Sequence, residues 1–281
     1  MRKTGIVAAS LALVLTVAGC ASKEAGIPVA AGGSGNTSSA PTGGGATTRE
    51  FGSANDLADA INSKSDAKKS AKMTFTTGVA GQAFKGQGAF NADGDNSAMQ
   101  MTMDIGSMKM EIILVDKVIY MKMPPGMGGA AAGTPDKPWT KITPGGDDPL
   151  SKQMTPMLQN IDDSFDIGMQ IDRIKSAGQI NKTTKEQLDG EEVTHYNITI
   201  DTAKLAENAP TPEAKESAKA LGSIGVKSFD MDWWINSDNL PVKITSVIPG
   251  PNNVKVTMEA TYTDWGKPVD VKAPPADQIA N

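Results

Sequence analysis

The chain is poor in the side chains that build most active sites. Its 281 residues include one cysteine and one histidine, and aromatic residues make up only 5%. A single cysteine excludes an intramolecular disulfide, and the GxSxG, HExxH, GxGxxG and P-loop patterns are absent. No apolar run is long enough for a comfortable membrane-spanning helix. We therefore expect no enzyme activity, no cofactor and no metal centre.

The first residues have the layout of an export signal. Arg2 and Lys3 precede a short apolar run from Ile6 to Val17, which predicts a signal peptide over residues 1–19. The run leads into Leu-Thr-Val-Ala-Gly-Cys, which resembles a bacterial lipobox ending at Cys20. The alternative is an ordinary secretory peptide with a chance cysteine. With a lipobox, acyl chains on Cys20 would hold the protein on the outer face of the cytoplasmic membrane.

Composition then divides the rest of the chain in two. Residues 20–50 are mostly Gly, Ser, Thr, Ala and Pro and predict a flexible linker, whereas residues 51–281 carry the apolar residues of a folded domain. Without residues 1–19, 25 basic residues face 32 acidic ones, a formal charge of −7. That balance argues against nucleic-acid binding and against electrostatic docking on a membrane.

The most regular pattern lies between Ser97 and Met123. Apolar residues, mostly methionine, alternate with polar ones on both sides of Gly106-Ser107. Alternation with period two predicts strands with one buried face, and Gly106 suits the positive φ of a type II′ hairpin turn. The stretch therefore predicts a β-meander whose inner face is coated with methionine.

Similar alternation recurs before and after this meander. It predicts about eleven short strands joined by hairpins, with helices over residues 56–63, 148–160, 163–175, 202–208 and 212–221. Residues 124–138 are a long Gly- and Pro-rich loop, and the C-terminal residues read as an irregular tail. The expected fold is α+β: a large curved antiparallel sheet, a half-open barrel, with helices packed on its concave face.

Three strand-and-turn motifs resemble a known family. They are LDGEEVTHY at 188–196, DWWINSDNLPVK at 232–243 and YTDWGKPV at 262–269. Together with the lipobox and linker, they resemble actinobacterial lipoproteins of the LppX/LprA/LprF/LprG type and, more distantly, the LolA/LolB-like half-barrel. The resemblance implies an apolar cavity between sheet and helices. It also implies binding of acylated lipids or lipoglycans, which are carried across the cell envelope.

The inner face supplies the candidate ligand cavity, because methionine is flexible and adapts to irregular apolar partners. For each methionine, plain core packing is the competing interpretation. A Cu(I) site built from thioethers of Met99, Met101 and Met103, or of Met121 and Met123, is a weaker alternative. The candidate cavity residues are Phe75, Met99, Met101, Met103, Met108, Met110, Ile112, Leu114, Met121, Met231, Trp233 and Met258.

The remaining chemically active side chains do not form a catalytic set. His195 should point outward, because its strand neighbours Tyr196 and Ile198 mark the inner phase. By the same phase, Trp233 faces inward and Trp234 outward. The acid pairs at 147–148 and 162–163 are most simply solvated or helix-capping. Besides a lipid carrier, the sequence therefore allows a non-catalytic interaction or sensor module with a filled core, with an enzyme a distant third.

Overall fold

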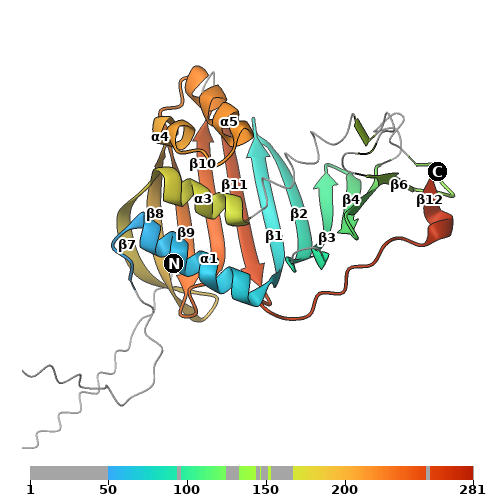
Figure 1. The fold of residues 1–281 in the computed structure, drawn as a ribbon, viewed down its shortest axis with the longest axis horizontal. Helices are drawn as coiled ribbons and strands as arrows, with labels where there is room; N and C mark the ends of the chain where they lie inside the picture. The colour runs from blue at the N-terminus through green and yellow to red at the C-terminus, as the bar shows by residue number, and fades with distance from the viewer. Residues whose placement is uncertain are drawn as a thin grey trace, which may run out of the picture. The chain divides into compact units, whose positions relative to one another are not determined.

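The computed structural model describes residues 50–93, 96–124, 133–143, 146, 151–152, 167–250 and 254–280. They form one open twelve-stranded sheet in the order β12-β6-β5-β4-β3-β2-β1-β11-β10-β9-β8-β7. Helices pack on one face of the sheet (Figure 1). This confirms the predicted α+β class. The strands are β1 (Ser70–Val79), β2 (Gln82–Asn91), β3 (Ala98–Ile105), β4 (Met108–Val115), β5 (Val118–Lys122), β6 (Trp139–Ile142), β7 (Gly178–Leu188), β8 (Glu191–Asp201), β9 (Ser228–Asn236), β10 (Pro241–Pro249), β11 (Lys255–Thr263) and β12 (Ile279–Ala280).

Two antiparallel meanders make up this sheet. Strands β1 to β6 pair in sequence order, and so do β7 to β11. The meanders are joined by β1 and β11, which lie antiparallel with Phe75 opposite Ala260. The C-terminal tail, expected to be irregular, instead ends in β12, which pairs in parallel with the edge strand β6. Two residues of strand are too short to show alternation, so the sequence pattern could not reveal β12.

The hairpin turns follow the predicted residue chemistry. Gly106 has a φ of 64°, as the turn between β3 and β4 requires. Asp116 and Lys117 both adopt positive φ between β4 and β5, and Asp189 and Gly190 do so between β7 and β8. The sequence predicts the turn after β1 at Gly81-Gln82, but the turn lies at Ala80-Gly81, because Val79 pairs with Gln82.

Four described helices lie against the inner face of the sheet: α1 (Ala54–Lys68), α3 (Ile167–Ala177), α4 (Thr202–Glu207) and α5 (Pro212–Ser223). Helix α1 begins after Ser53, whose hydroxyl accepts a hydrogen bond from the Asp56 amide, and it is longer than predicted. Figure 1 shows α1 and α3 side by side across the strands of the second meander. Leu57, Ile61 and Ile174 are fully buried there against the sheet.

Several predicted segments lie outside the described residues. They are residues 1–49, which include Cys20, the helix expected over 148–160 except residues 151–152, most of the 124–138 loop and both acid pairs. The described part of the helix expected over 163–175 is α3. No helix in the described part of the chain is long and apolar enough to cross a membrane.

Candidate ligand-binding pocket

The strand register places the predicted cavity residues on one face of the sheet. On β3 and β4, Met99 lies opposite Leu114, and Met101 lies opposite Ile112, whose other neighbour is Met121 on β5. Side chains opposite each other in neighbouring strands share a face. The neighbouring row, which contains Met103, continues across β2, β1, β11 and β10 to Trp233 on β9. The alternation of apolar and polar residues in the sequence therefore identifies the side chains on the inner face throughout the sheet.

Side chains on this face differ in how deeply they are buried. Seven of the predicted cavity residues are buried in the core: Phe75, Met101, Met110, Ile112, Met121, Met231 and Trp233. Four are half-buried: Met99, Met103, Leu114 and Met258. Met108 is 37% exposed, because it begins β4 at the hairpin end of the sheet. Thus most of the methionine face is filled by its own packing.

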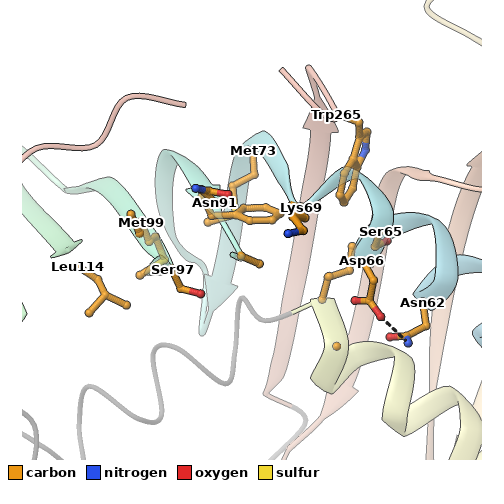
Figure 2. A pocket seen from close by; sticks show the side chains of 15 residues that line it. Asn62, Ser65, Asp66, Lys69, Met73, Asn91, Ser97, Met99, Leu114 and Trp265 are labelled. Atoms are coloured by element: carbon orange, nitrogen blue, oxygen red, sulfur yellow. Dashed lines mark hydrogen bonds between the residues drawn. The ribbon is translucent and has the colours of Figure 1, made fainter. Parts of the chain in front are cut away.

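A cavity of about 430 Å³ lies where the helices end and the methionine face begins. Figure 2 shows Asn62, Ser65 and Asp66 of α1 on one side, and Met99 and Leu114 of the strands on the other. Ligand pockets typically occupy ~300–1,000 Å³. Its lining residues are Asn62, Ser65, Asp66, Lys69, Met73, Phe90, Asn91, Ala92, Ser97, Ala98, Met99, Leu114, Ile167, Gly168 and Trp265.

Trp265 lines this cavity with an aromatic ring. Its ring stands edge-to-face to Phe90, with centroids 6.0 Å apart, and its indole N–H donates to the Pro241 carbonyl at 2.9 Å. The Tyr262 ring stacks on it at 5.8 Å. These contacts fix the half-buried indole at the cavity and give its polar N–H a partner.

Ion pairs between Asp264 and two lysines stabilise the turn that carries Trp265. Asp264, with a φ of 57°, accepts from Lys267 at 2.6 Å and from Lys72 at 2.8 Å. These hydrogen bonds, that from Lys267 foremost, lower the pKa of Asp264 from 3.8 to about 2. The Gly266 amide donates to the Ser70 carbonyl at 2.8 Å, which ties the turn to the start of β1.

The last turns of α1 and the residue after it supply the charged side chains at the cavity, and Asn91 and Ser97 add polar groups from the β2–β3 side. The Asn62 amide donates to Asp66 Oδ2 at 3.0 Å, and the Lys69 ammonium is paired with Asp93. Each charge at the rim thus has a partner. The Ser65 hydroxyl is different, because it is buried and has no hydrogen-bond partner among the described residues.

A second, smaller cavity of about 240 Å³ lies between α3, α4, α5 and the sheet. Its apolar lining includes Leu205, Leu221 and Phe229, and Asp172 and Arg173 contribute charge. None of the twelve predicted cavity residues lines it.

His195 lies on the opposite face of the sheet, as predicted. Its ring stacks on Trp234 at 4.3 Å, and its two nitrogens contact Glu186 and Asp232, each at 2.8 Å. Hydrogen bonds from Trp234 and then His195 lower the pKa of the Glu186 carboxyl. None of these contacts is a hydroxyl or thiol nucleophile, so the cluster is built as a cross-strand polar network.

No group of three His, Cys, Asp or Glu side chains among the described residues could hold a metal ion. A copper site made of methionine sulfur stays an untested prediction. Met101 and Met121, two of its candidate ligands, lie in the core at 2% and 0% exposure. Packing alone accounts for their position.

Sequence reasoning missed most of the cavity's lining. It found Met99 and Leu114 from alternation, but not Ser65, Lys69 or Trp265. The only signal for Trp265 was the motif at 262–269, and Ser65 lay beyond the helix predicted over residues 56–63. Their convergence depends on the packing of α1 against the β1–β11 pair, which local patterns do not encode.

The described residues form an α+β domain with a cavity between an open sheet and its helices. No protein-family model matches the chain, and no curated protein sequence matches it. Among solved structures, it is similar to the Mycobacterium tuberculosis lipoprotein LppX, with 12% identity and a TM-score of 0.46 over 78% of this chain and 98% of that chain. It is also similar to LprF from Mycobacterium bovis, with 14% identity and a TM-score of 0.42 over 78% and 97%.

A third similarity is to MucB in the Pseudomonas aeruginosa MucA/MucB complex, with 12% identity and a TM-score of 0.35 over 79% of this chain and 60% of that chain. LppX and LprF are of the lipoprotein type that the sequence motifs resemble.

Proposed function

We propose that this protein is a non-catalytic, extracytoplasmic lipoprotein that holds the acyl chain of a lipid or lipoglycan in the 430 Å³ cavity. The single observation that supports this is the composition of the cavity. Met73, Phe90, Met99, Leu114 and Trp265 give it an apolar wall, while its polar lining groups lie at the end of α1 and, with Asn91 and Ser97, beside the connection between β2 and β3.

Such a wall suits a hydrocarbon chain. Transfer from water contributes ~0.8 kcal/mol for each buried methylene, so a chain of several carbons would be held without any covalent step. Methionine on the sheet side adapts to chains of variable shape. In this proposal acylated Cys20 anchors the protein, and the linker of residues 20–50 lets the domain carry its lipid away from the outer face of the cytoplasmic membrane.

The test is acyl binding by the mature chain, residues 20–281, with Cys20→Ser to prevent acylation. Met99→Trp fills the cavity and is expected to lower the affinity for a fluorescent fatty acyl probe at least tenfold. Gln100→Trp is the matched control, because Gln100 is the next residue of β3 and is exposed on the opposite face. Native mass spectrometry of protein purified from an actinobacterium should show co-purified lipid. Ligand-free protein that also fails to bind the probe would contradict the proposal.

One observation favours a second candidate, a protein-interaction or sensor module. Met101, Met110, Ile112 and Met121 are packed in the core, so the methionine face is largely sealed. A module of this kind would meet its partner through an exposed surface and bind no acyl probe. Absence of probe binding together with capture of a protein partner would favour it.

A further inference from the structure

The hydroxyl of Ser65 lines the cavity, is buried, and lacks a hydrogen-bond partner among the described residues. Ser65 is 7% exposed, and its Oγ has no hydrogen-bond partner in the described part of the chain. Three other buried polar atoms share this condition: Thr194 Oγ1, Thr202 Oγ1 and Trp233 Nε1. Of the four residues, only Ser65 lines one of the cavities described above. A buried polar group without a partner calls for an explanation, and a missing ligand is one.

The position of Ser65 on α1 is one where an apolar residue would be expected. Leu57 and Ile61 are fully buried, and Ser65 continues their row at the next four-residue step. The ridge that packs on the sheet therefore ends in a hydroxyl where it reaches the cavity. Helix packing alone gives no reason for this hydroxyl.

The charges at the rim narrow down the group that Ser65 could meet. Lys69 is already paired with Asp93, and Asp66 adds a negative charge on the turn that carries Ser65. A carboxylate or phosphate at Ser65 would therefore lie close to a carboxylate and find its nearest lysine engaged. An uncharged carbonyl oxygen accepts a hydrogen bond without that repulsion.

We propose that Ser65 is a binding residue that donates its hydroxyl hydrogen to an uncharged carbonyl oxygen of the ligand. This inference rests on the proposed function. The carbonyl is that of an acyl ester or amide, with the attached chain lying along Met73, Phe90 and Trp265. Ser65 then selects acyl esters and amides over free fatty acids, whose carboxylate is charged at neutral pH.

The experiment compares two competitors of equal chain length, palmitic acid and its methyl ester, for displacement of a fluorescent acyl probe at pH 7.5. The protein is the mature chain with Cys20→Ser. The ester is expected to bind at least fivefold more tightly than the acid. Ser65→Ala should weaken ester binding about fivefold to tenfold and leave acid binding nearly unchanged. Ser63→Ala, on an exposed position of the same helix, is the matched control.

Folding of Ser65→Ala is checked by its melting temperature, which should not fall, because the substitution removes an unpaired buried hydroxyl. Ser65→Cys keeps the volume with a weaker donor and should give intermediate ester affinity. If Ser65→Ala leaves ester binding unchanged, or if the acid binds more tightly, this inference is overturned while acyl binding stands. If the unsubstituted chain binds neither compound nor the probe, the proposed function itself fails.

Discussion

Methionines that share one phase of alternation differ widely in exposure. Met101, Met121 and Met231 are at most 2% exposed, whereas Met108, on the same face of the sheet, is 37% exposed. Alternation reports which face a side chain occupies, and the distance from the sheet's hairpin ends decides how much covers it. Chemical reactivity should therefore vary along one face.

Brief treatment with hydrogen peroxide should oxidise Met108 well before Met101 and Met110, because oxidation of methionine follows exposure of its sulfur. Trypsin cuts after Lys109, so Met108 and Met110 fall in different peptides and their oxidation can be measured separately by mass spectrometry. An acyl ligand should slow the oxidation of Met99 but not that of Met108. Equal rates for Met108 and Met110 would contradict the exposures described here.

Gly86 on β2 leaves room for a core aromatic ring. A Cβ added there would lie 2.2 Å from Cζ of Phe75 and 2.7 Å from the Thr102 carbonyl oxygen. Gly86→Ala is therefore expected to lower the free energy of unfolding by about 1–3 kcal/mol, measured by urea denaturation. Gly52→Ala is the control, because no atom lies within 4 Å of the added Cβ. Equal effects of the two substitutions would show that Phe75 does not occupy this space.

At the scale of elements, the turn from Asp264 to Lys267 connects the sheet to the cavity. It follows β11, sets Trp265 against Phe90, and is fastened to β1 by Lys72 and by the Ser70 carbonyl. The turn depends on a carboxylate whose pKa is about 2. Its contribution to stability should therefore change with pH.

Asp264→Asn should destabilise the fold at pH 7. Because the folded chain lowers this pKa from 3.8 to about 2, the carboxylate stabilises the fold above pH 3.8, and this stabilisation is lost as the pH falls through 2. Urea denaturation at several pH values should show the difference between the two proteins shrinking below pH 4. Asp270→Asn removes an exposed ion pair with Lys272 and should have little effect at any pH. A difference that did not depend on pH would contradict the role of the Asp264 charge.

The elements best predicted from sequence were those whose signal is local. The hairpin at Gly106 and that at Asp189-Gly190 need positive φ over one or two residues, and the sequence marks them directly. The sequence also predicts a short strand over residues 139–142, which is β6 in the structure. By contrast, β12 and the placement of Ser65 depend on partners more than a hundred residues away or on helix packing, so no local pattern reveals them.

At the scale of the whole sheet, stability should be uneven from centre to edge. Strand β1 is paired on both sides along eight or more residues, whereas β12 pairs with β6 through two. Hydrogen exchange measured by mass spectrometry should therefore be slowest in β1, β11 and β9, and fastest in β6 and β12. A ligand in the cavity should add protection in β2, β3 and the end of α1. Uniform protection across the sheet would contradict this gradient.

The pairing of β1 with β11 also determines when, during synthesis, the sheet can be completed. The two strands come from opposite ends of the domain, with β1 ending at Val79 and β11 beginning at Lys255. At ~5–20 residues per second, the ribosome needs on the order of 10–35 seconds to make the intervening chain. Until then one edge of β1 has no partner and the two meanders cannot join. A chain whose two meanders join only when nearly all of it has been made therefore leaves this strand edge unpaired throughout most of its synthesis.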